Sequence, residues 1–595
     1  MFRFRPKEGT LKVAMAAGKH YLKKAGRLPG ETGDNSGFAL GRGATPVESS
    51  PVAESPTTKP SPAARSKWAR GVRLLHPSHT HTAFTATLVL MASSFLSRII
   101  GLVKVSYIAW LFGKAMEADA FNAAFVLPDM ISYFLVGGAA SITFVSILTR
   151  YREAGREEDG QRSLSVILTT MYLVLGGAVM LAEIFAPWYI HLWFPGFDSE
   201  KAALCVKLTR ILLPAQLFFF AGGIFGAVLL VRKQFSVQAV APLIYSLGTI
   251  VGGLLLVRRL GVTSLAIGTL GGAFLGPFLL NAYFARRMGT RYRVLLDWRD
   301  PGLREWVRLS IPLMVGISLV SADGWIIAHF ASRTAGAVSL MTYAKQLFTA
   351  PVSILAQAAG AASMPFFASL WSQQRRYEFA TGVADSVSRV VALGLLVGSA
   401  MAALAVPLVE LLYMRGRFSL NDSRECAAYF AVFSISVFLW SAQAIYSRAF
   451  FAAGNTFIPM AAGTIITLAS WPVYAVLYRL FGVMGLAIAS DLGITVQTVT
   501  LAVLLHQRRL VSLASLDYLE LGRCLLAGLG SGAAVWILWG TLGVVLHKIA
   551  PGRIYLTDIT VLLAGTALWV AVAKWMLEKS GSALPRVAMQ RLGLE

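Results

Sequence analysis

Charged residues are scarce in this chain of 595 residues, and their scarcity argues against a soluble enzyme. Asp, Glu, Lys and Arg together make up 14% of the sequence, whereas soluble domains contain about 25%. Hydrophobic residues make up 56%, and the mean hydropathy is +0.62. This excess of apolar residues is typical of a protein whose chain crosses a membrane many times.

Cysteine is also rare, and residues that form familiar catalytic or metal sites lack the required spacing. The three cysteines lie far apart in apolar stretches, which indicates neither a disulfide framework nor a CxxC metal pair. The eight histidines form no HExxH pattern, and the sequence contains no P-loop and no nucleophile elbow. We therefore expect a protein that is not an enzyme and uses no cofactor or metal ion.

The charge that is present is mostly positive, with 54 Lys and Arg against 30 Asp and Glu and a net charge of +24. Such an excess commonly indicates nucleic-acid binding. Here the basic residues border apolar runs, so we expect them to face anionic membrane lipids, with no nucleic acid as a partner.

Residues 1–80 differ in composition from the rest of the chain. They are basic at both ends, rich in Gly, Pro, Ser and Thr between residues 30 and 66, and contain no apolar segment of the signal-peptide kind. This composition predicts a disordered, basic cytoplasmic arm. A gene start assigned too far upstream, without a role, is the alternative.

From Ala83 onward, apolar runs alternate with short polar loops. A membrane helix needs about 20 apolar residues, and the sequence predicts fourteen spans: 83–112, 119–149, 164–186, 203–231, 237–257, 262–285, 305–331, 335–370, 380–413, 424–452, 458–478, 482–506, 521–547 and 556–577. We expect an all-α polytopic membrane protein with lobes at 81–300 (spans 1–6) and 301–512 (spans 7–12). Spans 13 and 14 and a cytoplasmic tail would occupy residues 513–595.

Arginine and lysine concentrate in the loops that follow even-numbered spans, as at residues 150–162 and 286–299. The positive-inside rule places these loops and both termini in the cytoplasm. Two basic clusters, at residues 258–259 and 415–424, lie on the opposite side and go against the rule.

A repeated pattern relates spans 4–6 to spans 10–12. Residues 259–267 (RLGVTSLAI) resemble residues 479–488 (RLFGVMGLAI), with one inserted residue. Six spans per repeat give both halves the same orientation, which favours an axis along the membrane normal and alternating access by rocking. Chance similarity between helices rich in Leu, Ala and Gly is the alternative.

Ionisable residues inside the predicted spans are the candidates for a functional site, because a charge at the bilayer centre costs about 3 kcal/mol or more. Arg98 and Lys104 lie in span 1, about 9 Å apart along the helix and about 120° apart around it. The other cations are Arg210, Lys345 and Arg448. The acidic residues are Asp129, Asp323, Asp385 and Asp491.

Together these cations predict a positively charged chamber for an anionic head group, most simply a phosphate or pyrophosphate. Snorkelling near helix ends or ion pairs between helices would also explain them, above all Arg210 and Arg448. The candidates for ion coupling are Asp323, Asp385 and Asp491, and helix pairing is an alternative for Asp323 and Asp491.

Short motifs follow one another in a fixed order from Ala83 to Leu577. They are SRIIG at 97–101, LFG at 111–113, ADAF at 118–121, FVLP at 125–128, FVSIL at 144–148, PGF at 195–197, RILLP at 210–214, RGRF at 415–418 and RAFFAAGNTFIP at 448–459. In order and spacing the chain resembles the MurJ/MviN lipid II flippases of the multidrug/oligosaccharidyl-lipid/polysaccharide exporter superfamily.

The resemblance implies a carrier that moves lipid II, the undecaprenyl-pyrophosphate-linked peptidoglycan precursor, from the cytoplasmic to the periplasmic leaflet of the bacterial inner membrane. Two lobes would rock about a cationic cavity, spans 13 and 14 would hold the lipid tail, and membrane potential, sodium or protons would drive the cycle. Cell-wall synthesis enzymes would be further partners. The substrate-binding residues it implies are Arg98, Lys104, Asp119, Arg210, Lys345, Gln346 and Arg448.

The chain departs from the family pattern where charges are expected. Lys104 replaces an arginine and is followed by Val105 in place of an aspartate, Ser132 and Gln346 stand at arginine positions, and Gly137 replaces an acidic residue. Lys345 would restore the charge missing at Gln346, one residue early. An exporter of another lipid-linked oligosaccharide or polysaccharide therefore also fits the sequence.

Two further alternatives belong to other classes. A cation-coupled drug antiporter would need acidic residues at the midplane, and the basic set argues against it. A scaffold for envelope enzymes would tolerate the lost arginines.

Overall fold

A computed structural model of the chain describes residues 83–136, 138–315, 319–543 and 554–585. The predicted basic arm, residues 1–80, and the last ten residues of the predicted tail lie outside these ranges. Within them every regular element is a helix. All described residues belong to one compact unit.

Ten helices of the described ranges are long and apolar enough to cross a membrane, or eleven if a pair bent by 43° counts as one span. The prediction of an all-α polytopic membrane protein is thereby confirmed, whereas the number fourteen is not. Predicted spans 2 and 7 are each interrupted by residues outside the described ranges, 137 and 316–318.

The first helices of the chain form what we call the N-terminal group. Its members are α3 (Ala83–Phe112), α4 (Met116–Ala123), α5 (Val126–Ile131), η1 (Ser132–Val136), α6 (Gly138–Glu153), α7 (Glu157–Trp193), α8 (Ser199–Leu212), α9 (Ala215–Val231), α10 (Phe235–Leu260), α11 (Thr263–Ala273), η2 (Phe274–Leu280) and α12 (Asn281–Arg287).

The C-terminal group follows α13 (Pro301–Val315), which packs against α6 and α7. Its members are α14 (Leu319–Ala331), α15 (Ala337–Ser372), α16 (Arg376–Ala403), α17 (Ala405–Tyr413), α18 (Leu420–Ile435), α19 (Val437–Ala452), α20 (Phe457–Phe481) and α21 (Val483–Gln507). After them come η3 (Leu513–Ser515), α22 (Tyr518–Leu538), η4 (Trp539–Gly543) and α24 (Ile554–Lys579).

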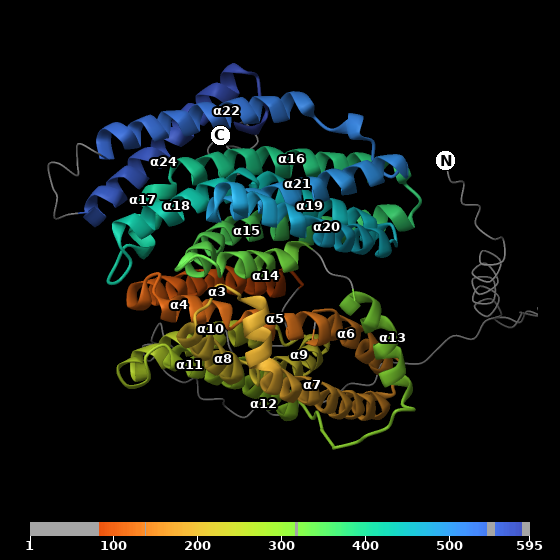
Figure 1. Cartoon of the computed structure of the whole chain (residues 1–595). Helices are drawn as coiled ribbons and strands as arrows, with labels where there is room; N and C mark the ends of the chain where they lie inside the picture. Colours follow the sequence, from red (N-terminus) through yellow and green to blue (C-terminus); the bar gives the residue numbers. More distant parts are fainter. Residues whose placement is uncertain (1–82, 137, 316–318, 544–553, 586–595) are drawn as a thin grey trace, which may run out of the picture. The chain divides into compact units, whose positions relative to one another are not determined.

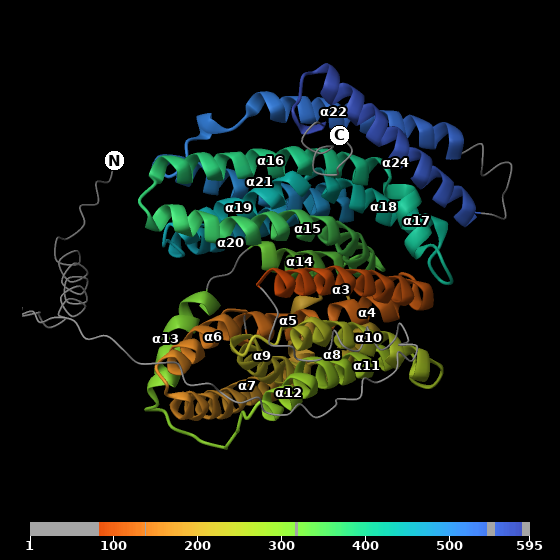
Figure 2. The same cartoon turned by 180° about the vertical axis from the view of Figure 1, so that it is seen from behind.

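Helix α3 is the member of the N-terminal group that faces the C-terminal group, with α10 on one side of it and α15 on the other (Figures 1 and 2). Helices α22 and α24 pack against each other, and α22 covers α16 on the outside of the C-terminal group. The lobe boundary predicted at residue 300 remains a prediction. Because α3 touches both groups, its side chains are well placed to line any space between them.

Two predicted spans, although each continuous as a candidate membrane span, change helix geometry at a proline. Pro214 separates α8 from α9, and Pro277 lies in the π-helical stretch η2 that joins α11 to α12. A proline ring has no N–H to donate and clashes with the preceding turn, so the regular ladder is interrupted at that point.

Helices α10 and α11 are packed backbone to backbone through glycine. A Cβ atom on Gly248 would lie 2.5 Å from the Cα atom of Gly272, and one on Gly252 would lie 2.4 Å from that of Gly268. The two pairs are four residues apart on each helix, so they form one small-residue stripe. This stripe holds α10 closely against α11, and α10 forms one wall of the candidate site.

The largest buried cluster joins both groups near the C-terminal end of α3. Its aromatic members include Phe112, Phe121 and Phe194 of the N-terminal group and Tyr343 and Tyr413 of the C-terminal group. The two groups are thus sealed against each other at this end of α3.

Candidate functional site

A cavity of about 340 Å³ lies against α3, and its lining is unusually polar for a membrane protein. Arg98 and Lys104 line it from α3, and Gln346 lines it from α15. The remaining lining residues are Ser93, Ser97, Gly101, Gln238, Ala239, Pro242 and Ser246. The cavity is therefore built from both helix groups, with two cations on its α3 wall.

Gln346 closes the cavity on the side of α15. Its side-chain nitrogen lies 3.6 Å from the position that a Cβ atom on Gly101 would take. A Cβ atom at this distance would be in ordinary van der Waals contact with the amide. Position 101 of α3 therefore lies directly beside Gln346 of α15.

Arg98 and Lys104 differ in their surroundings. The Lys104 ammonium lies 5.9 Å from the ring centroid of Tyr245 on α10, and it interacts electrostatically with Asp129 of α5. Arg98 has no ion pair with any residue of the described ranges. Arg98 is thus the cation on this wall whose charge is available to an anionic ligand.

Lys345 does not line this cavity. Its ammonium forms an ion pair with the carboxylate of Asp323 on α14, with side chains 18% and 1% exposed respectively. Asp323 also accepts a hydrogen bond from the hydroxyl of Tyr474, and Asp491 of α21 interacts electrostatically with Lys345. Lys345 therefore belongs to a buried polar cluster within the C-terminal group, together with two of the ion-coupling candidates.

The other predicted site residues also lie away from the cavity lining. Arg210 on α8 donates from Nε to the backbone carbonyl of Glu183, 3.0 Å away. Arg448 is half-buried on α19, and Asp385 is exposed on α16. Of the seven predicted substrate-binding residues, the cavity brings together Arg98, Lys104 and Gln346.

Asp119 joins the two helix groups at the C-terminal end of α3. Its carboxylate, fully buried, accepts backbone hydrogen bonds from Gly336 (2.8 Å) and Ser339 (2.9 Å) at the start of α15. The same carboxylate forms a 2.7 Å ion pair with Lys201 of α8. A negative charge at a helix N-terminus satisfies free N–H groups and complements the helix dipole.

A second set of charges reinforces this contact. Lys114, in the loop between α3 and α4, forms ion pairs with Asp422 (2.8 Å) and Glu425 (3.2 Å) of α18. The hydrogen bond to Asp422 is the main reason that the pKa of Lys114 is raised above its ordinary value. Lys114 is therefore fully protonated at neutral pH, and the contact between the groups is ionic.

Glycine allows the two backbones to touch at this contact. Gly113 and Gly416 both have positive φ angles, +57° and +59°. A Cβ atom on Gly416 would lie 2.3 Å from the carbonyl oxygen of Trp110, and one on Gly113 would lie 2.5 Å from that of Arg417. Residues 110–119, 336–343 and 415–425 together form a closed contact that we call the gate.

The sequence reasoning did not single out Lys114, Lys201, Asp422 or the N-terminus of α15 as parts of a site. Gly113 and Gly416 did appear in short motifs, and a glycine in a loop motif commonly marks a positive φ angle or a close backbone approach. These two motifs are thus a signal by which a close backbone contact could have been predicted, although they do not identify the segments that meet there.

The fold, the cavity and the gate define a polytopic membrane transporter, in which polar space between two helix groups is sealed at one end. The chain belongs to the family described as lipid II flippase MurJ, whose family model matches residues 108–553. This confirms the family predicted from the sequence motifs.

Individual proteins agree with this assignment. A probable lipid II flippase MurJ of Haemophilus influenzae is 27% identical over 464 residues, which cover 74% of this chain and 90% of that protein. A lipid II flippase MurJ of Burkholderia cenocepacia is 26% identical, covering 71% and 84%.

Among solved structures, a lipid II flippase MurJ in an inward closed conformation is similar in fold, with a TM-score of 0.67 and 19% identity. The similarity covers 83% of this chain and 99% of that one. An inward-facing multidrug resistance transporter of the MATE family has a TM-score of 0.59 and 15% identity, covering 70% and 98%.

Proposed function

We propose that this protein translocates lipid II from the cytoplasmic to the periplasmic leaflet of the bacterial cytoplasmic membrane. The observation that carries the proposal is the position of Arg98 on a polar cavity between two helix groups, with its charge unpaired within the described ranges. Membership of the lipid II flippase MurJ family supports the choice of cargo.

The cavity suits the charged pyrophosphate of the cargo. A pyrophosphate cannot enter the bilayer core unaided, because an uncompensated charge there is very costly. The guanidinium of Arg98 presents paired N–H donors to phosphate oxygens, and Lys104 adds a second positive charge about 9 Å along α3. The prenyl chain would remain in lipid beside the protein.

The cavity must widen during transport. Its 340 Å³ lies at the low end of the range for drug-sized ligands, and a disaccharide with a peptide is larger than such a ligand. We infer that the two helix groups move apart about α3, so that the gate opens when the cavity end closes.

The gate sets an energetic threshold for this movement. Asp119 accepts two backbone hydrogen bonds and pairs with Lys201, and hydrogen bonds to charged groups contribute roughly 1.5–3 kcal/mol each. Cargo binding or an ion gradient would offset this cost. Membrane potential, sodium and protons all remain candidate energy sources, and we propose no cofactor and no enzymatic step.

We propose an orientation with the gate on the periplasmic side and both termini in the cytoplasm. The arginine-rich ends of α6 and α12 lie at the opposite end from the gate, and their charge favours the cytoplasmic face. Cell-wall synthesis enzymes on the periplasmic side would then receive the cargo.

A second candidate function is export of another lipid-linked oligosaccharide or polysaccharide. Gln346 faces the cavity where the family pattern has an arginine, so one phosphate contact of the family is absent. An uncharged amide there would suit a cargo with fewer phosphate charges.

The test is rescue of cells depleted of their own lipid II flippase, with periplasmic access of the precursor as the readout. The expected result is growth and precursor access with the wild-type chain and neither with Arg98→Ala. Correctly inserted protein at normal levels that gives no rescue would reject lipid II as the cargo. Restored export of a different lipid-linked saccharide in a matching deletion strain would support the second candidate.

A further inference from the structure

The segment between α12 and α13, residues 288–300, lies extended along α7 (Figure 1), and we call it the strap. Three backbone N–H groups of the strap, at alternate residues, donate to side chains of α7. The donors are Arg291, Arg293 and Leu295, and the acceptors are, in the same order, Gln161 (3.3 Å), Ser165 (3.2 Å) and Thr169 (3.3 Å). Backbone groups two residues apart on the extended strap thus meet side chains four residues apart on one face of α7.

The second half of the strap is held at the same end of α7. Arg162 forms an ion pair of 3.1 Å with Asp297, and the hydroxyl of Ser163 donates to Asp300 at 3.0 Å. Gly289 has a φ angle of +86°, which lets the chain turn sharply out of α12. The strap is therefore a preformed part of the structure.

A groove of about 890 Å³ lies beneath the strap, between α7, α9 and α12. Its volume falls in the range of pockets for small molecules. One end is apolar and is lined by Leu168, Tyr172, Phe225, Phe278 and Ala282. The other end is lined by Arg286, Gly289, Thr290, Arg291, Tyr292 and Arg293.

The arginines at the polar end have their charge available. Arg286, Arg291 and Arg293 form no side-chain ion pair within the described ranges. A fourth cation adjoins them: the Nη1 atom of Arg232 lies 4.0 Å from the position of a Cβ atom on Gly289.

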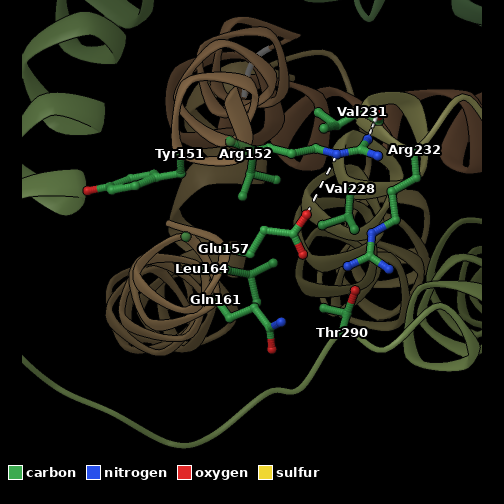
Figure 3. A pocket seen from close by; sticks show the side chains of 11 residues that line it. Tyr151, Arg152, Glu157, Gln161, Leu164, Val228, Val231, Arg232 and Thr290 are labelled. Carbon is green, nitrogen blue, oxygen red and sulfur yellow. Dashed lines mark hydrogen bonds and ion pairs between the residues drawn. The ribbon is translucent and has the colours of Figure 1, made fainter. Parts of the chain in front are cut away.

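Figure 3 shows the small pocket that adjoins the groove, with the guanidinium of Arg232 beside Thr290. The carboxylate in this pocket, Glu157, is already paired with Arg152 at 3.7 Å. The carboxylate of Asp297 on the strap is likewise paired, with Arg162. Arg286, Arg291 and Arg293 therefore give the polar end of the groove a net positive charge among the residues that the structure describes.

The groove and the strap over it together have the length and polarity of one lipid in one leaflet. The strap is bonded to α7 from Gln161 to Thr169, and the groove lining on this helix ends at Tyr172. This stretch of α7 rises by about 16 Å, which is about half of the 30 Å hydrocarbon core. The arginines lie at the helix end and the aromatic residues toward the middle. A ligand that fits would place an anion at the surface and an apolar chain inside the leaflet.

The outer side of the strap supports a lipid in preference to a soluble peptide. Val294, Leu296 and Trp298 are 78%, 52% and 61% exposed, and arginines flank this stretch at Arg293 and Arg299. Tryptophan and arginine together are typical of the boundary between lipid and water.

We propose that this groove binds one anionic glycerophospholipid of the surrounding membrane. Its phosphate contacts Arg286, Arg291 and Arg293, and an acyl chain lies along Tyr172, Phe225 and Phe278. The site lies in the N-terminal group, is separate from the cavity at Arg98, and does not depend on the identity of the transported cargo.

Native mass spectrometry of the full-length protein, titrated with phosphatidylglycerol or with phosphatidylcholine, tests the proposal. The wild type is expected to retain one tightly bound phosphatidylglycerol and to bind phosphatidylcholine at least tenfold more weakly. The triple variant Arg286→Ala/Arg291→Ala/Arg293→Ala should weaken phosphatidylglycerol binding at least tenfold, since each arginine near anionic lipid contributes about a fivefold gain.

Two matched variants separate the site from general charge and folding. Arg287→Ala removes one arginine next to Arg286 but outside the groove lining, and it should bind as the wild type does. The triple Arg→Lys variant keeps the charge and should retain most of the binding, which a misfolded protein would not.

Three results would overturn the proposal. They are equal binding of the two lipids, an unchanged affinity in the triple alanine variant, and displacement of the bound phospholipid by lipid II at stoichiometric concentration. The last result would assign the groove to the cargo. Phe278→Trp offers an independent check, because a larger ring should fill the apolar end and reduce binding without altering charge.

Discussion

The carboxylate of Asp119 accepts a hydrogen bond from the backbone N–H of Gly336, so a residue of the N-terminal group caps a helix of the C-terminal group. The bond is 2.8 Å long and fully buried. The same carboxylate also binds the backbone N–H of Ser339 and the ammonium of Lys201. We therefore expect the bonds from Asp119 to α15 to be present when the gate is closed and to be lost together when it opens.

Asp119→Asn should destabilise the closed gate and reduce transport at least tenfold. The substitution leaves the Lys201 ammonium, only 8% exposed, without its counter-charge, and breaking a buried pair in this way costs about 3–5 kcal/mol. Thermal unfolding of the purified protein and precursor translocation are the measurements. Glu158→Gln, which neutralises an exposed carboxylate on α7, is the control and should be neutral in both.

Arg98→Ala should reduce translocation more than tenfold, whereas Arg98→Lys should reduce it only a few-fold. Lysine keeps the charge but loses the paired donors that suit a phosphate. Translocation by equal amounts of membrane-inserted protein is the measurement. Arg210→Ala removes an arginine outside the cavity lining and should retain activity; equal losses in the two alanine variants would argue against a specific role of the cavity.

Lys345→Gln should be harmful because it leaves the buried carboxylate of Asp323 unpaired. The double variant Lys345→Gln/Asp323→Asn should then recover part of the stability and transport, since Asp323 is neutralised together with Lys345 while Asp491 keeps its charge. Unfolding midpoints and translocation of the two single variants and the double variant give the coupling. If the double variant is stable but stays inactive, Lys345 acts on the cargo or on ion coupling rather than as a partner of Asp323.

Gly416→Ala should hold the gate open. A methyl group there would overlap the carbonyl oxygen of Trp110, 2.3 Å from the Cβ position, so the two groups must separate. Accessibility of a cysteine introduced in the gate at Ser339 to a water-soluble thiol reagent measures the opening. Gly482→Ala is the control, because Gly482 has the same φ angle as Gly416, +59°, but no atom lies within 4 Å of its Cβ position. This variant should have the same backbone strain without an increase in cysteine labelling.

The ionic part of the gate should be insensitive to pH across the physiological range. The pKa of Lys114 is raised above its ordinary 10.5 by its hydrogen bond to Asp422. A raised pKa in the closed state means that the contribution is complete below 10.5 and is lost as the pH rises above that value. Thiol labelling of the gate in wild type and in Lys114→Met, between pH 6 and 9, should therefore differ by a constant factor.

Much of the fold follows from the sequence, because its determinants are local. Runs of about 20 apolar residues predict membrane helices whatever their neighbours are. Proline is a weaker signal: the helix changes at Pro214 and Pro277, whereas Pro187 and Pro242 lie inside continuous helices. The number of spans is harder to predict, since kinks, π-helical stretches and polar residues blur the ends of each run.

The candidate site is only partly readable from the sequence. Arg98 and Lys104 share one helix, so their separation follows from helix geometry, and the structure places both on one cavity. The pairing of Lys345 with Asp323 depends on how α14 meets α15, which no local pattern specifies. The role of Asp119 likewise requires knowing that α4 ends beside the first turn of α15.

The glycine stripe between α10 and α11 has a mechanical consequence. Because no side chains separate them, we expect α10 and α11 to move together as one rigid unit. This unit carries Gln238, Pro242 and Ser246 of the cavity lining. The α10 wall of the cavity should therefore keep its shape when the α15 side moves. A side chain added at Gly248 or Gly252 should therefore deform the cavity wall from behind, although neither glycine lines the cavity.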